Sequence, residues 1–130
     1  MYVPPGFATV SPYIFASDAH SYVRFLIDGL GAEEVGRSER PDGQIANCQI
    51  RIGTAMLMVS EAQDEYQPSR AAFYIFVDDA DAAMARAIAA GARLEMQVDD
   101  MPYGDRQGGI ADPSGNIWWI SQRIAEEPYF

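Results

Sequence analysis

The sequence predicts an α+β fold in which two tandem βαβββ modules form curved mixed sheets around a shared cleft. The first observation is an internal repeat, because YIFASDA at residues 13–19 returns as YIFVDDA at residues 74–80, an offset of 61 residues. The second is that each copy joins a strand-like run to a helix-like run. A duplicated unit of this kind predicts two similar halves related by a pseudo-two-fold axis.

The first module is expected to span about residues 8–60 and to start with a strand at residues 10–16, where aromatic and β-branched side chains are frequent. Ser17 or Asp18 can cap the helix that follows, and Gly31 can take the left-handed conformation that ends a helix. The apolar face of this helix consists of Tyr22, Phe25, Leu26 and Leu30. Further strands are expected at residues 33–38, 44–52 and 54–60.

The second module is expected to span about residues 70–123, with its first strand at residues 71–77. Two aspartates precede its helix, Asp81 lies in the first turn, and Gly91 follows the last turn. The predicted buried stripe of the helix is Met84, Ala87 and Ile88. Further strands are expected at residues 93–98, 107–111 and 116–122, with a turn at residues 112–116 in which Asp112 and Asn116 are the turn-forming residues.

Composition limits the class of protein. The 130 residues suffice for a single domain, residues 1–130, with a buried core, and the polar segment 61–69 is expected to link the modules. The single cysteine, Cys48, excludes a disulfide within the chain and is expected to be a buried, unreactive thiol. The formal charge of −10 disfavours nucleic acid and anionic membranes and favours a cationic partner, although such acidity also serves solubility alone. We see no signal peptide and no membrane-spanning run, so the expected location is the cytoplasm.

Strand alternation separates side chains that face the helices from those that face the cleft. The residues expected to bind a ligand are Tyr13, Phe15, Asn47, Gln49, Met58, Tyr74, Phe76, Tyr103, Arg106 and Trp119. Aromatic rings stack on flat ligands, and methionine adapts to irregular shapes, whereas neutral amides orient a ligand without acting as a base. The alternatives are that the rings only fill the interior, and that Asp105 and Arg106 form an ion pair that fixes a loop.

Three stretches and the doubled βαβββ unit carry a family resemblance. VDDADAAMARAIAAGA begins at residue 77, YGDR at residue 103 and ADPSGNIWWI at residue 111. Together they resemble the vicinal oxygen chelate superfamily of glyoxalases, bleomycin-resistance proteins and extradiol dioxygenases. The opening VPPGFATVSPYIF and the dipeptide Asp42-Gly43 resemble a small glyoxalase-like subfamily. The resemblance implies the fold given above and a homodimer, while the superfamily hosts many different activities.

In the enzymes of that superfamily, His and Glu side chains from the first and closing strand of each module hold a divalent metal. Carried over by motif, these positions are Ser11, about Met58, Ala72 and Trp119. None supplies a ligand suited to the ions these enzymes use, and the single histidine, His20, falls on the first helix and is expected at the surface. We therefore expect no metal and no other cofactor. An oxygen-only site from Glu61 or Asp64 is the alternative.

The sequence therefore favours a metal-free protein that binds a small aromatic or cationic molecule. The resemblance to bleomycin-resistance proteins implies sequestration of a drug, and hence antibiotic resistance, without chemical change. The runner-up is a metal-dependent enzyme, either a glyoxalase-type lyase or isomerase or a dioxygenase. A third reading is a subunit whose partner supplies the missing groups.

Overall fold

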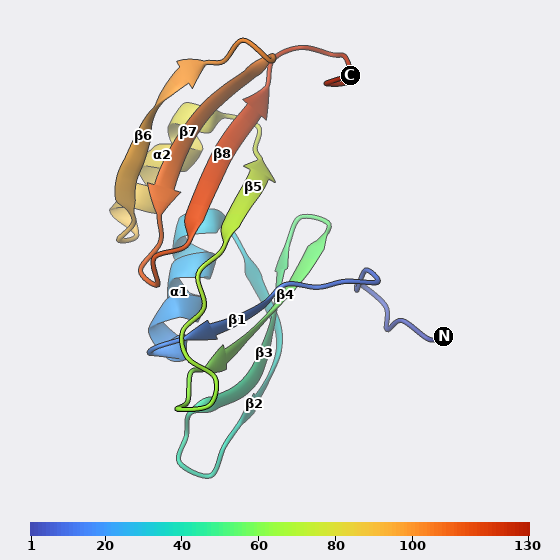
Figure 1. The fold of residues 1–130 in the computed structure, drawn as a ribbon, viewed down its shortest axis with the longest axis vertical. Helices are drawn as coiled ribbons and strands as arrows, with labels where there is room; N and C mark the ends of the chain where they lie inside the picture. The colour runs from blue at the N-terminus through green and yellow to red at the C-terminus, as the bar shows by residue number, and fades with distance from the viewer. The chain divides into compact units, whose positions relative to one another are not determined.

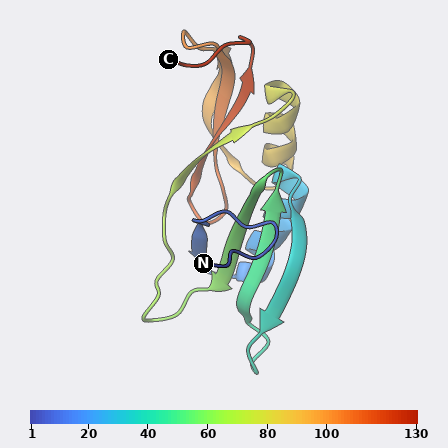
Figure 2. The ribbon, with the colours of Figure 1, turned by 90° about the vertical axis from the view of Figure 1, so that its right-hand side faces the viewer.

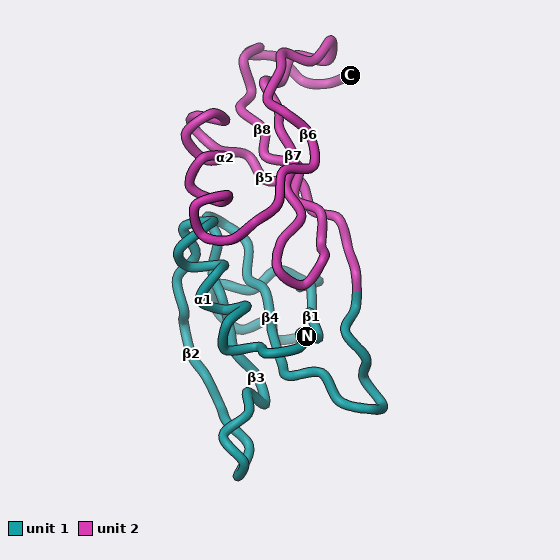
Figure 3. Tube along the Cα trace, turned by 90° about the vertical axis from the view of Figure 1, so that its left-hand side faces the viewer, with its two compact units in different colours: residues 1–69 teal, residues 70–130 magenta.

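The structure is a computed structural model that describes residues 1–130. The chain divides into two compact units, residues 1–69 and residues 70–130 (Figure 3). Each unit contains four strands in one mixed sheet and one helix, in the chain order β-α-β-β-β (Figure 1). The predicted α+β fold of two βαβββ modules is confirmed. The shared cleft between the modules stays a prediction.

The first unit is built around α1, which lies against one face of its sheet (Figure 2). Its strand order is β1-β4-β3-β2, and β1 runs parallel to β4 while the other pairs are antiparallel. Tyr22, Phe25 and Leu26 of α1 are buried as predicted, because apolar side chains three and four positions apart share one helix face. The elements are β1 Tyr13–Ala16, α1 Ala19–Leu30, β2 Glu33–Glu39, β3 Ile45–Ile52 and β4 Ala55–Glu61.

Both ends of α1 follow the sequence expectation. Asp18 is the N-cap, and its carboxylate accepts hydrogen bonds from the backbone N–H of Ser21 at 3.3 Å and from the Ser21 hydroxyl at 2.7 Å. The Glu61 carboxylate adds a second cap by accepting from the N–H groups of Asp18 and Ala19, each at 2.9 Å. Gly31 ends the helix in the left-handed conformation, with φ of 71°.

The second unit repeats this plan with the order β5-β8-β7-β6. In α2 the buried stripe is Ala80, Met84 and Ala87. The prediction that Ile88 is buried is wrong, since 42% of Ile88 is exposed. Ile88 lies one position beyond Ala87, which turns it about 100° away from the narrow stripe that a 10-residue helix presents to its sheet. The elements are β5 Ala72–Phe76, α2 Ala80–Ala89, β6 Arg93–Asp100, β7 Asp105–Ala111 and β8 Ile117–Arg123.

The internal repeat extends to the strand register. Tyr13 pairs with Met58 in the first sheet, and Tyr74 pairs with Trp119 in the second, so both partners shift by the same 61 residues. The first strand begins at Tyr13, three residues later than predicted, because Val10 is exposed and Pro12 has no N–H to donate to a neighbouring strand.

The connecting segments are held by specific contacts. The segment 61–69 returns along β1, where the N–H of Ser69 donates to the carbonyl of Phe15 at 3.3 Å and the Tyr66 ring stacks on the Phe15 ring with centroids 5.3 Å apart. The turn at residues 112–116 is confirmed. Neither helix has the length and apolar character that a membrane-spanning helix requires.

Candidate functional site

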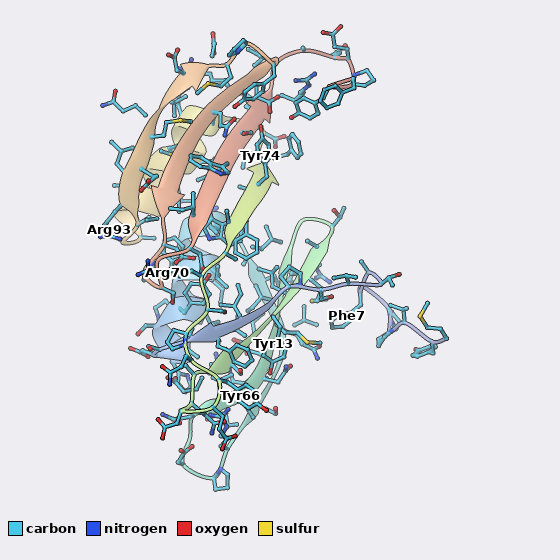
Figure 4. All side chains as sticks on the ribbon, viewed as in Figure 1. Phe7, Tyr13, Tyr66, Arg70, Tyr74 and Arg93 are labelled. Carbon is cyan, nitrogen blue, oxygen red and sulfur yellow. The ribbon has the colours of Figure 1, made fainter.

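Each sheet has one face covered by its helix and one face that the helix leaves open. On the open face of the second sheet, Tyr74 of β5 (Figure 4) is 44% exposed. Phe76 of the same strand is 58% exposed, and the two rings lie 5.3 Å apart. Trp119 of β8, the cross-strand partner of Tyr74, is half-buried beside them. Three predicted ligand-binding residues therefore gather on one face of one sheet.

A glycine on β7 seats the Trp119 ring. Gly109 is the cross-strand partner of Trp119, and a Cβ atom at Gly109 would lie only 2.6 Å from Cζ3 of the indole ring. The neighbouring residue, Gly108, faces the helix side of the sheet, where a Cβ atom would lie 2.8 Å from the Sδ atom of Met84 on α2. The glycine pair thus allows the helix and the indole to approach β7 from opposite sides.

A polar cluster centred on Asp105 continues this open face. Asp105 is the first residue of β7 and its side chain is completely buried. Its Oδ1 accepts from Nη1 of Arg123 at 3.0 Å, while its Oδ2 accepts from the hydroxyl of Tyr129 at 2.5 Å and from the hydroxyl of Tyr74. A buried carboxylate needs such partners, because an unpaired charge without water costs several kcal/mol.

The same contacts set the ionisation of the cluster. Burial alone would raise the pKa of Asp105, but hydrogen bonds from Tyr129, Tyr74 and Arg123 outweigh it and lower that pKa. Burial, followed by the hydrogen bond to Asp105, raises the pKa of Tyr74. The hydrogen bond to Asp105 also raises the pKa of Tyr129. At neutral pH the cluster therefore consists of one carboxylate, one guanidinium and neutral phenols.

Two predicted site residues from the 103–106 stretch separate in the structure. The Tyr103 hydroxyl donates to Oε1 of Gln107, which also accepts from Tyr74 at 3.2 Å, so Tyr103 joins the open face. Arg106 instead forms ion pairs with Asp81 and Asp100 at 2.8 and 2.9 Å. The predicted Asp105–Arg106 ion pair is wrong, because adjacent strand residues point to opposite faces and Arg106 reaches the helix side.

The open face of the first sheet carries the corresponding aromatic group. Tyr13 is 43% exposed, and its ring lies 5.1 Å from that of Phe15. Tyr66 stacks on the same Phe15 ring, whereas the Tyr13 ring is tilted by 45° to it, so the three residues form one aromatic cluster on this unit (Figure 4). Residues 1–11 run near the same sheet and, with Gln49 and Met58, line a groove of about 480 Å³. Asn47 is half-buried on β3, two positions before Gln49.

The positions at which the superfamily's enzymes hold a metal do not fit one here. Ala72 has no donor atom and Trp119 packs its ring on Gly109, while Ser11 and Met58 line the groove of the first unit. Both ring nitrogens of His20 are engaged, with Nε2 donating to the carbonyl of Gly43 and Nδ1 accepting from Arg37, each at 2.9 Å. No group of three or more His, Cys, Asp or Glu side chains is placed to hold a metal ion.

Sequence reasoning missed the centre of the polar cluster. The sequence predicts a loop at Asp105, because the strand is expected to start at Gln107. The shared parity of Asp105, Gln107 and Gly109 along β7 is the signal that places them on one face. No local motif connects Arg123 and Tyr129 with Asp105, because they lie 18 and 24 positions beyond it in the sequence.

Comparison with known proteins agrees with this architecture. Residues 7–120 match the glyoxalase/bleomycin resistance protein/dioxygenase superfamily. The uncharacterized protein Rv0887c of Mycobacterium tuberculosis is 29% identical over 128 residues, which cover 90% of this chain and 75% of that protein.

Two solved structures illustrate the shared fold. TioX from Micromonospora sp. ML1 has a TM-score of 0.72 and 23% identity, with 93% of this chain and 100% of TioX covered. TnmS3 from Streptomyces sp. CB03234, described as an antibiotic binding protein, has a TM-score of 0.69 and 22% identity over 89% of this chain and 98% of TnmS3. With residues 7–120 matched and the fold shared, the chain belongs to the glyoxalase/bleomycin resistance protein/dioxygenase superfamily.

Proposed function

We propose that this chain binds a small flat aromatic molecule through the open faces of its sheets and does so without a metal. The observation that carries the proposal is the aromatic group of the second unit. Tyr74 and Phe76 expose about half of their side chains, and Trp119 lies next to them in place of the metal-binding glutamate of the superfamily's enzymes. Such rings gain about 0.5–1.5 kcal/mol per stacked or tilted aromatic contact beyond the area they bury.

Charge and comparison support the same class of ligand. The formal charge of −10 favours a ligand that carries positive charge, and long-range attraction of this kind raises the association rate at low salt. TnmS3, which shares the fold at 22% identity, is described as an antibiotic binding protein. An antibiotic or similar aromatic compound is therefore the ligand class that we propose, with resistance by sequestration as the role.

The donor set argues against the enzymatic alternative, a metal-dependent lyase, isomerase or dioxygenase. The buried Asp105 is occupied by an arginine and two phenols, and Glu61 caps α1 with both of its carboxylate oxygens. We further propose a homodimer, as the family resemblance implies, and a location in the cytoplasm.

The two tryptophans allow a matched fluorescence test. Trp118 is buried, donates its indole N–H to Asp112 at 2.9 Å and stacks on Phe73, whereas Trp119 lies on the open face. Trp118→Phe therefore leaves a reporter at the proposed site, and Trp119→Phe leaves a reporter in the core. Acriflavine, a flat cationic dye, and flavone, a flat neutral compound, serve as probes.

We expect at least one probe to quench the emission of the Trp118→Phe variant with saturation, and to leave the emission of the Trp119→Phe variant almost unchanged. The quenching should persist after dialysis against EDTA. Loss of binding after EDTA, equal quenching of both variants, or no saturable quenching by either probe would contradict the proposal.

A further inference from the structure

The polar cluster on the second unit already holds a phenol, and that phenol belongs to the chain itself. The Tyr129 hydroxyl donates to Oδ2 of Asp105 at 2.5 Å, and the Arg123 guanidinium lies over the Tyr129 ring with Cζ 4.2 Å from the centroid. The Asp105 carboxylate thus binds the hydroxyl, and the Arg123 guanidinium binds the ring. Together they form a complete recognition site for a hydroxylated aromatic ring.

Asp105 and Arg123 belong to strands of the sheet, whereas Tyr129 lies in the segment that follows the last strand. Asp105 is completely buried on β7, and Arg123 ends β8, where Nη1 also donates to the carbonyl of Tyr103 at 2.5 Å and Nη2 donates to the carbonyl of Glu127 at 2.7 Å. Gly104 leaves room for this arginine, because a Cβ atom there would lie 2.7 Å from Nη1. Residues 124–130 form no helix or strand, and Tyr129 is 45% exposed.

We propose that Asp105, Arg123 and Tyr74 form a subsite for a phenolic hydroxyl of the ligand, and that the Tyr129 ring occupies this subsite in the free protein. The inference rests on the proposed function, because it names the chemical group by which an aromatic ligand is held. A ligand phenol replaces the Tyr129 phenol, donating to the same carboxylate and stacking on the same guanidinium. The carboxylate requires a donor at this point, which selects neutral phenols over phenolates and over rings without a hydroxyl.

p-Cresol, which reproduces the tyrosine side chain, tests this assignment, and toluene is the matched probe without the hydroxyl. Binding to the full chain is followed by NMR chemical shifts of the Asp105 and Arg123 amides and by the melting temperature. In Tyr129→Ala the competitor is absent, so we expect p-cresol to bind about tenfold or more tightly than to the wild type, the equivalent of a hydrogen bond to a charged group. Toluene should show no such gain.

Tyr129→Phe separates the ring from the hydroxyl. This variant keeps the ring over Arg123 and should give an intermediate affinity for p-cresol, whereas Tyr129→Ala/Asp105→Asn should lose the gain. Equal p-cresol affinity in wild type and Tyr129→Ala, or an equal gain for toluene, would overturn the subsite. If that happened while acriflavine or flavone still quenched Trp119, the proposed function would stand and only the subsite would fail.

Discussion

Replacing Gly109 by alanine tests how closely Trp119 is seated on β7. The new Cβ atom would lie 2.6 Å from Cζ3 and 2.8 Å from Cε3 of the indole. Carbon atoms in contact normally lie about 3.5–4.0 Å apart, so the ring must withdraw by about 1 Å. Gly109 does not have a positive φ, hence alanine introduces no backbone strain and the effect arises from the ring contact alone.

Overpacking of this kind costs about 1–3 kcal/mol. Because Trp119 is half-buried and can move outward, we expect the lower end, about 1 kcal/mol, which lowers the melting temperature of a chain of this size by about 4 °C. Differential scanning calorimetry measures the stability. In the Trp118→Phe background, a red shift of the remaining emission reports that Trp119 has moved toward water.

Gly108→Ala is the matched control, since it adds the same methyl group to the neighbouring position. Its Cβ would meet Sδ of Met84 at 2.8 Å on the helix side, where a flexible, unbranched side chain can rearrange. We expect this variant to leave the Trp119 emission unchanged. An unshifted emission in Gly109→Ala, or an equal shift in both variants, would refute the close seating of the indole on β7.

Three other predictions concern buried polar groups. Asp112→Ala removes the acceptor of two backbone N–H groups and of the Trp118 indole N–H, so we expect the free energy of unfolding, measured in urea, to fall by about 2–3 kcal/mol. The control Asp42→Ala loses one exposed turn contact and should lower the free energy of unfolding far less. The lowered pKa of Asp105 stabilises the fold above the unfolded carboxyl pKa of about 3.9, so the stability difference between wild type and Asp105→Asn should be constant near neutral pH and shrink as pH falls through the folded pKa. Burial raises the pKa of the Cys48 thiol to about 11, so Ellman's reagent at neutral pH should react only after unfolding, and rapid labelling of the folded protein would disprove that burial.

The local features of the fold were predictable because they depend on neighbours in sequence. The caps at Asp18 and Gly31 and the turn at residues 112–116 follow from short motifs with a direct physical cause. The repeat offset of 61 residues also predicts which positions of the two modules are equivalent, and the strand pairs Tyr13–Met58 and Tyr74–Trp119 follow this offset. The prediction that Ile88 is buried was wrong because helix periodicity gives the direction of a side chain but not the width of the helix face that the sheet covers.

The candidate site was predictable only in its aromatic part. Alternation along β5 and β8 placed Tyr74, Phe76 and Trp119 on one face, since this requires only period two. The Asp105 cluster draws on residues from β5, β8 and the segment that follows β8, and no spacing rule connects them. The sequence predicts Arg106 in a loop at the mouth of the cleft, with the next strand starting at Gln107, whereas β7 begins at Asp105 and Arg106 forms an ion pair with Asp81 of α2.

Ligand binding without a metal is tested most directly by inductively coupled plasma mass spectrometry of protein purified without chelator. The positions equivalent to the enzymes' metal ligands carry Ser11, Met58, Ala72 and Trp119, so we predict far less than one equivalent of nickel, zinc, iron or manganese per chain. One full equivalent of any of these metals, with an activity that disappears when the metal is removed and returns when it is restored, would contradict the prediction.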